Sequence, residues 1–142
     1  VAHPALSPDE KKLYFSSDMP GSVGFDIDDK LTMSDIWETD LLEDGTFSEP
    51  RNLKNINTAG RETFPFVSNS NVIYFASSGH QGLGGLDVFS SSINSDGYPG
   101  EVINIGKPIN IENNITPIRI KPKIAGSINS ANIIRLLQAK HL

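Results

Sequence analysis

One pattern of residues occurs twice in the chain, and this repeat limits the possible folds more than any other feature. The stretch His3-Pro4-Ala5-Leu6-Ser7 with Tyr14-Phe15 returns as Phe64-Pro65-Phe66-Val67-Ser68 with Tyr74-Phe75. Later anchors recur in the same order: Asp35-Ile36-Trp37 as Asp87-Val88-Phe89, Asp44-Gly45 as Asp96-Gly97, Glu49 as Glu101, Asn52-Leu53 as Asn104-Ile105, and Ile56-Asn57 as Ile109-Asn110. Short repeated units bury a continuous core by stacking, so the second unit should pack on the first.

Each unit predicts four short strands joined by turns. The expected strands are 4–7, 13–17, 35–42 and 49–53 in the first unit, and 64–68, 72–77, 87–93 and 101–105 in the second. The 12 glycines and 9 prolines suit a chain with many turns. Asp44-Gly45 and Asp96-Gly97 predict hairpins, because both residue types tolerate positive φ.

The fold prediction is therefore all-β, with two four-stranded antiparallel β-propeller blades that form a fragment of a larger propeller. Propeller repeats have periods of about 40 to 50 residues, close to the spacing found here. A β-sandwich is the alternative, but a sandwich requires no repeat. We place the first blade at 1–57 and the second at 58–112.

The last segment, 113–142, begins a third copy at Thr116-Pro117-Ile118 and then departs from the pattern. From Asn113 onward the chain has five basic residues and no acidic one. An irregular or helical tail is predicted, with a helix capped at Ser130. Two interpretations stay open, a genuine helical cap and a non-native end.

Six aromatic residues occupy equivalent positions of the two units. We predict that they form the structural core of the blades, in the layers packed between adjacent blades. They are Tyr14, Phe15, Trp37, Tyr74, Phe75 and Phe89.

Composition and charge exclude several classes of function. The formal net charge of −5 argues against binding of a nucleic-acid backbone, which requires a basic face. Without cysteine, thiolate metal sites and cysteine nucleophiles are excluded. No apolar run is long enough to predict a membrane span. Because Val1 lies directly in a repeat motif, we expect the natural start to lie upstream.

Few residues suggest metal binding or catalysis. The acidic loop with Asp26, Asp28 and Asp29, followed by Asp35, is a weak calcium candidate, since hard cations prefer carboxylate oxygens. Its spacing does not fit an EF-hand, and a solvated charged loop is the simpler interpretation. The glycine-rich run 82–87 leads into a strand, so it predicts a hairpin loop and not a dinucleotide site.

The histidines His3, His80 and His141 have no partners at metal-ligand spacing. Asp35 and Asp87 begin equivalent strands, and we expect each to hydrogen-bond to a neighbouring turn. The sequence therefore predicts no catalytic residues and no cofactor.

The repeat motif resembles the WD40-like repeat of TolB-type propellers. The residues that carry this resemblance are His3-Pro4-Ala5-Leu6-Ser7-Pro8-Asp9-Glu10, Leu13-Tyr14-Phe15-Ser16-Ser17 and the Asp-Ile-Trp and Asp-Val-Phe strands. With Phe75-Ala76-Ser77-Ser78-Gly79-His80 and Gly84-Gly85-Leu86-Asp87-Val88-Phe89 included, the pattern looks like the version found in OmpA-family envelope proteins of Bacteroidetes. The first unit departs from it in the longer loop at 19–30, and the tail departs from it as well.

This resemblance implies a periplasmic, outer-membrane-associated protein with protein partners in the envelope and cell-wall linkage through other domains. The expected function is a non-catalytic binding or scaffolding module, not an enzyme. One alternative is a propeller hydrolase or a domain accessory to a peptidase. A second alternative is a calcium-stabilised adhesion module built on the acidic loop.

Overall fold

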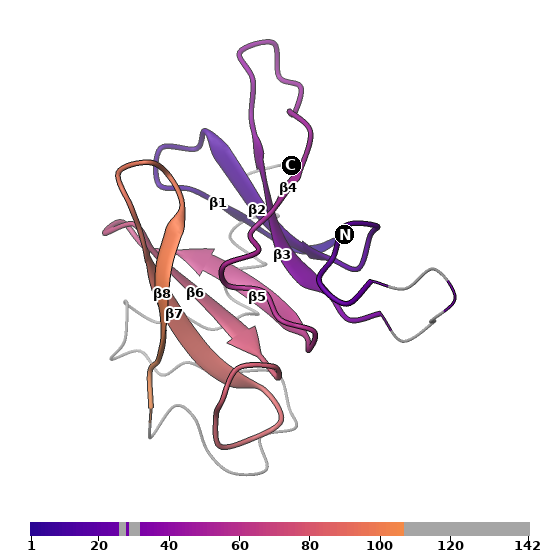
Figure 1. Ribbon diagram of the computed structural model, residues 1–142. Coiled ribbons are helices and arrows are strands. Elements are labelled where there is room, and N and C mark those ends of the chain that lie inside the picture. Colours follow the sequence, from indigo (N-terminus) through magenta and orange to yellow (C-terminus); the bar gives the residue numbers. More distant parts are fainter. Residues whose placement is uncertain (26–27, 29–31, 107–142) are drawn as a thin grey trace.

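The computed structural model describes residues 1–25, 28 and 32–106, which form two four-stranded antiparallel sheets (Figure 1). The first sheet contains β1 (Ala2–Leu6), β2 (Lys12–Ser17), β3 (Asp35–Asp40) and β4 (Arg51–Asn52). The second contains β5 (Glu62–Val67), β6 (Val72–Ser77), β7 (Asp87–Ile93) and β8 (Pro99–Asn104). In both sheets the strands are adjacent in sequence order, and the described residues include no helix. The prediction of an all-β fold with two such sheets is confirmed.

The fourth strand of the first unit is shorter than expected. The prediction of a strand over 49–53 was wrong for most of its length, since β4 contains Arg51 and Asn52 alone. Pro50 has no N–H to donate to a ladder, which explains why the regular ladder of β4 begins only at Arg51. Two residues earlier, Ser48 bonds Asp40 through both backbone and side chain, because its N donates to Asp40 O and its Oγ accepts from Asp40 N, both at 2.9 Å. The expected strand over 35–42 likewise ends earlier, at Asp40.

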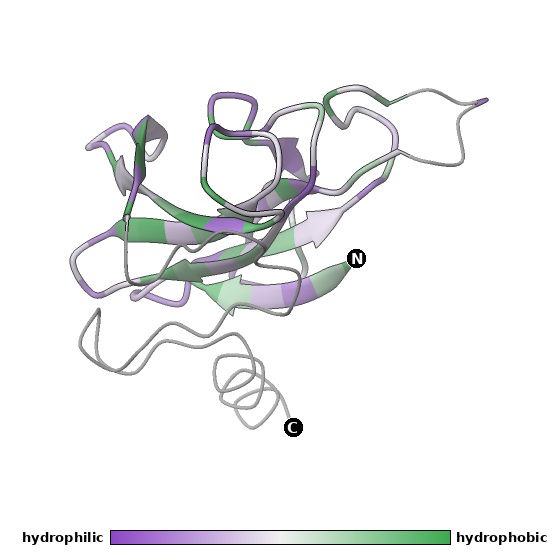
Figure 2. Ribbon diagram, turned by 90° about the horizontal axis from the view of Figure 1, so that it is seen from below, coloured by the Kyte–Doolittle hydropathy of each residue, from purple (hydrophilic) through white to green (hydrophobic). Residues whose placement is uncertain are grey.

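A hydrophobic cluster joins the two sheets. Hydrophobic residues occur along the strands of both sheets (Figure 2). Buried side chains of both units belong to one cluster: Ala5, Tyr14, Ile36, Leu53 and Ile56 from the first, and Val67, Ile73, Phe75, Ala76, Val88 and Phe89 from the second. The second unit is thus stabilised by burial against the first.

The six predicted core aromatics occupy two different layers. Phe75 and Phe89 stack with ring centroids 6.1 Å apart and belong to the cluster between the sheets, as does Tyr14. Tyr74 is half-buried and packs against that cluster. Phe15 and Trp37 are buried and face each other in the register of β2 and β3. Because side chains alternate along a strand, they lie on the opposite face of the sheet from Tyr14.

The two sheets meet at the first strand of the second unit. Strand β5 lies against β1, β2 and β3 (Figure 1). Backbone and side-chain hydrogen bonds fix its start, since Glu62 N donates to Ser34 O and Ser34 Oγ donates to Glu62 O, both at 2.8 Å. The region where β1 and β5 begin is therefore held in place from both units.

Candidate functional site

A pocket of about 420 Å³ opens where β1 and β5 begin. Residues that line it include His3, Ser16, Asp18, Arg61, Thr63 and Phe64. We call it the His3–Phe64 pocket. It is the strongest site candidate among the described residues because aromatic, hydroxyl and charged side chains converge there.

The backbone at the pocket has the same unusual conformation in both units. The pairing of β1 with β2 shifts between Ala2 and Ala5, and that of β5 with β6 shifts between Thr63 and Phe66. Inside these bulges His3 has φ of 53° and Phe64 has φ of 54°. A positive φ is costly for a residue with a side chain, and the following proline restricts the backbone further.

This repeated conformation brings His3 and Phe64 together. Their ring centroids lie 4.1 Å apart, with an angle of 51° between the ring planes. The two residues come from first strands of different units, at equivalent positions of the repeat. Backbone strain that recurs at a pocket is more common at functional sites than elsewhere.

Two hydroxyl groups orient the imidazole of His3. Its Nδ1 lies 3.0 Å from both Ser16 Oγ and Thr63 Oγ1. Ser16 Oγ also donates to Ala2 O at 3.1 Å, and Thr63 Oγ1 donates to Ser16 Oγ at 3.4 Å. Both hydroxyl groups therefore hold the Nδ1 edge of the ring, whichever ring nitrogen carries the proton.

Burial lowers the pKa of His3, because a charged imidazolium would lose hydration in this position. The ring is therefore in its neutral form near pH 7. The contact between Ser16 and His3 has the distance of a nucleophile and base pair, but the Ser16 hydroxyl is buried and already donates to a carbonyl group. The geometry thus suits positioning of the ring better than attack by the hydroxyl.

The rim of the pocket carries opposite charges on two exposed residues, Arg61 and Asp18. Within the described part of the chain neither side chain forms an ion pair. The backbone of Arg61 is fixed by two hydrogen bonds, since its N donates to Ser78 Oγ and its O accepts from Ser78 N, both at 2.9 Å. Both side chains are therefore available to a ligand.

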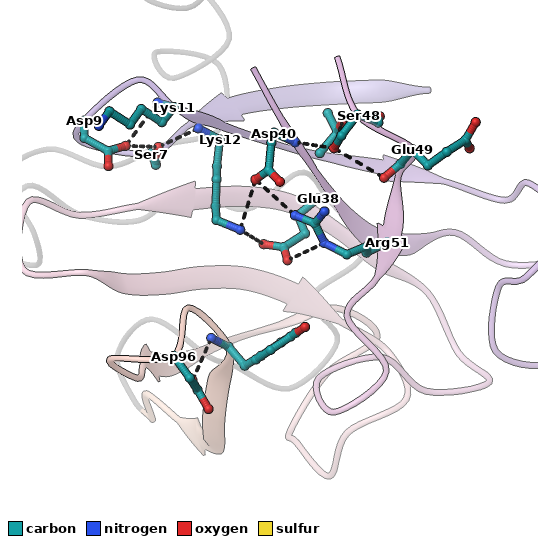
Figure 3. Close-up of polar contacts among 12 residues, drawn as sticks. Ser7, Asp9, Lys11, Lys12, Glu38, Asp40, Ser48, Glu49, Arg51 and Asp96 are labelled. Carbon is teal, nitrogen blue, oxygen red and sulfur yellow. Dashed lines mark hydrogen bonds and ion pairs between the residues drawn. The ribbon is translucent and has the colours of Figure 1, made fainter. Parts of the chain in front are cut away.

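A second polar cluster lies at the other end of β2 and β3 (Figure 3). The buried carboxylate of Glu38 lies 3.4 Å from Lys12 Nζ and 3.2 Å from Arg51 Nε, and Asp40 bonds the same two cations. The Arg51 guanidinium holds the pKa of Asp40 below its usual range. These four charges satisfy one another across three strands, so we interpret the cluster as structural.

The expectation for Asp35 and Asp87 is confirmed. Asp35 Oδ2 accepts a hydrogen bond from Val23 N at 2.6 Å, and Asp87 Oδ2 accepts one from Gly84 N at 3.0 Å. Each aspartate thus fixes the loop that precedes its own strand. In the second unit the approach is close, since a Cβ on Gly82 would lie 1.8 Å from Asp87 Oδ2.

The calcium candidates fall largely outside the described residues. Asp26 and Asp29 lie outside them, and Asp28 is exposed. Within the part of the chain that is described, no group of three or more acidic or histidine side chains is placed to hold a metal ion. The calcium hypothesis therefore stays a prediction.

Of the other two histidines, His80 lies within the described residues and His141 does not. His80 lies in the loop after β6, where its Nε2 is 2.6 Å from Ile56 O and its ring packs against Phe75 and Phe89. It is part of the junction between the sheets. His141 lies outside the described residues.

Sequence reasoning missed the association of His3, Ser16 and Thr63. The available signal was the X-Pro pair, His3-Pro4 and Phe64-Pro65, at the same point of each repeat. It marks the bulge, but a contact between residues 60 positions apart depends on how the units stack.

No family model, curated protein or solved structure matches the chain. No helix in the described part of the structure is long and apolar enough to cross a membrane.

Proposed function

We propose that the chain supplies two consecutive blades of a β-propeller and serves as a non-catalytic binding or scaffolding module of a bacterial envelope protein. The arrangement of the first strands of the two units supports the proposal that they are propeller blades. In a propeller the first strand of every blade lies nearest the axis, and here β1 and β5 lie against each other while β4 and β8 are at the opposite edges of their sheets.

The packing between the units supports the same proposal. The aromatic pair Phe75 and Phe89 of the second unit belongs to one cluster with Tyr14 and Ile36 of the first. The equivalent pair of the first unit, Phe15 and Trp37, lies on the face of its sheet away from Tyr14. The two units thus turn opposite faces toward their junction, an arrangement that consecutive blades of a ring would have.

The envelope location and the protein partners are proposed from the resemblance to OmpA-family proteins. The binding role is supported by the His3–Phe64 pocket, which lies at the inner strands of both units. Propellers typically have four to eight blades, so two blades would form part of a larger ring.

Chemical cross-linking tests the architecture. The chain has no cysteine, so paired cysteine variants introduce the only thiols. We expect His3→Cys with Phe64→Cys to be bridged by the short thiol cross-linker dibromobimane, whereas His3→Cys with Ile103→Cys, on the outer strand β8, should not be bridged. Bridging of the second pair alone would contradict the arrangement.

Fractionation and activity assays test the functional part. An antibody against the purified chain should detect the protein in the envelope fraction of the source cells. The purified chain should not turn over peptide or glycan substrates. Detection in the cytosolic fraction would overturn the proposed location, and turnover abolished by Ser16→Ala would favour a hydrolase.

A further inference from the structure

The opposite charges at the rim of the His3–Phe64 pocket limit the charge of its ligand. Arg61 and Asp18 both line the pocket, and neither forms an ion pair with any residue that the structure describes. An anionic ligand would be attracted by Arg61 and repelled by Asp18, and a cationic ligand would meet the reverse. The rim therefore favours a ligand with no net charge that both donates and accepts hydrogen bonds.

The interior of the pocket adds an apolar surface and a further polar group, the imidazole of His3. Phe64 and Leu86 line it, together with the imidazole of His3, which the hydroxyl groups of Ser16 and Thr63 orient. An aromatic ring beside mixed polar groups matches a sugar, because a sugar has an apolar C–H face bordered by hydroxyls that donate and accept.

The strands at the pocket disfavour the main alternative, an extended peptide bound through its backbone. That mode adds a strand to an exposed edge and requires free N–H groups on it. Both edges at the pocket, β1 and β5, carry a bulge and a proline, Pro4 and Pro65, and proline has no N–H. A peptide would have to bind without regular main-chain pairing.

We propose that the His3–Phe64 pocket binds a neutral carbohydrate that packs on Phe64 and hydrogen-bonds to Asp18, Arg61 and the imidazole of His3. The inference rests on the binding role proposed above and names its ligand class. It places recognition at the point where the first strands of both units contribute side chains to one surface.

Titration followed by NMR of the 15N-labelled chain tests the proposal. The probes are the neutral trisaccharides chitotriose, cellotriose and maltotriose, the anionic galacturonate trimer, the cationic glucosamine trimer and the peptide trialanine. We expect saturable shifts of the amides of Asp18, Arg61 and Thr63 with at least one neutral trisaccharide. The charged trimers should bind at least about fivefold more weakly, because repulsion by one rim group removes the hydrogen bond that a neutral sugar makes there, while attraction to the other adds only an exposed ion pair.

Matched variants identify the groups that bind. Arg61→Gln and Asp18→Asn should each weaken binding about threefold to tenfold, the effect of replacing a charged hydrogen-bonding group by a neutral one. Lys54→Gln and Glu101→Gln remove the same charges from exposed residues that do not line the pocket, and should leave the affinity unchanged. Phe64→Leu, which keeps the apolar bulk but loses the ring, should weaken binding about threefold or more.

Three outcomes would overturn the proposal. They are unchanged spectra with every neutral trisaccharide, tighter binding of a charged trimer or of trialanine, and affinity that is the same in all pocket variants. These failures are distinguishable from failure of the proposed architecture. If the chain binds none of the sugars but the His3→Cys and Phe64→Cys pair is still bridged, the proposed architecture is retained and only the ligand class is wrong.

Discussion

At the scale of single residues, two buried carboxyl groups differ in how fully they are hydrogen-bonded. Asp35 Oδ2 accepts from Val23 N and from Asn52 Nδ2, both at 2.6 Å. Asp35 Oδ1 is buried and has no hydrogen-bond partner within the described structure. Burial raises the pKa of Asp35, because the charged form loses hydration that two hydrogen bonds only partly replace.

Replacing Asp35 with asparagine should therefore be tolerated. The amide oxygen can accept both hydrogen bonds of Oδ2, and no charge is buried, so we expect stability at pH 7 to be unchanged or raised by up to about 1 kcal/mol. The folded state holds the Asp35 proton more tightly than the unfolded state, so this group makes wild-type stability fall as pH rises from the ordinary aspartate range through the raised pKa.

Urea denaturation of wild type and Asp35→Asn across this pH range measures the effect. The difference between the two proteins should grow in favour of the variant as pH rises. A variant that is more than about 2 kcal/mol less stable at pH 7 would show that the charge of Asp35 is needed to hold the loop at Val23.

Glu62 shows the opposite pattern, since both of its oxygens are used. Oε1 accepts from Thr58 Oγ1 and Ser77 Oγ, both at 2.6 Å, and Oε2 accepts from Thr58 N at 2.8 Å. Burial raises the pKa of Glu62 as well. Its side chain ties the connection between the units to the end of β6.

We therefore expect Glu62→Gln to lower the free energy of unfolding by about 1 to 3 kcal/mol. An amide can accept through one atom only, so its NH₂ group would face a donor, either Thr58 N or the two hydroxyls. Urea denaturation at pH 7 compares the free energies of unfolding of Glu62→Gln and Asp35→Asn, which each remove one buried carboxylate. Equal stability of the two variants would contradict the difference in hydrogen bonding.

At the scale of elements, the connection between the sheets packs closely on the loop after β6. A Cβ on Gly79 would lie 1.7 Å from Thr58 Oγ1 and 3.1 Å from Gly60 N. We expect Gly79→Ala to lower stability by about 1 to 3 kcal/mol, because the backbone must shift to relieve the overlap. In the control Gly100→Ala on β8 the nearest atom is 3.4 Å away, an ordinary contact.

Thermal or urea unfolding of both glycine variants measures this difference. If Gly79→Ala is as stable as Gly100→Ala, the connection moves away from the loop without cost. The close approach would then not contribute to the position of the second sheet.

Strands with several repeated residues close together were well predicted from the sequence. β2 and β6 contain the repeated Tyr-Phe pairs, and the structure places strands over the predicted ranges 13–17 and 72–77. The fourth strand of the first unit was poorly predicted because Pro50 interrupts pairing where the repeat alone suggests a strand. Such strand boundaries depend on local features, namely turn residues and side-chain hydrogen bonds such as that of Ser48 to Asp40 N.

At the scale of the whole molecule, the candidate site depends on contacts between the units that no local pattern contains. The repeat predicted that Asp35 and Asp87 fix turns, because each acts within its own unit. It did not predict that His3 Nδ1 lies 3.0 Å from Thr63 Oγ1, because this contact depends on how β5 packs against β1. Equivalent positions in a repeat thus identify shared local roles, but the pocket results from the stacking.

The stacking also predicts that the two sheets unfold together. Phe89 of the second sheet is buried in the cluster that contains Ile36 of the first, and Trp37, the single tryptophan, reports on the first sheet. We expect Phe89→Ala to lower the free energy of unfolding by about 3 to 5 kcal/mol. The urea transition seen by Trp37 fluorescence should move to lower urea, although the substitution is in the other sheet.

Ile103→Ala is the matched control, because Ile103 on β8 is 54% exposed and its truncation removes little buried surface. Its Trp37 transition should stay close to that of the wild type. If instead Phe89→Ala leaves the Trp37 transition in place while the amide signals of β5 to β8 are lost, the sheets are independent units. The shared cluster would then contribute little to the first sheet, and the blade-on-blade packing on which the proposed function depends would be wrong.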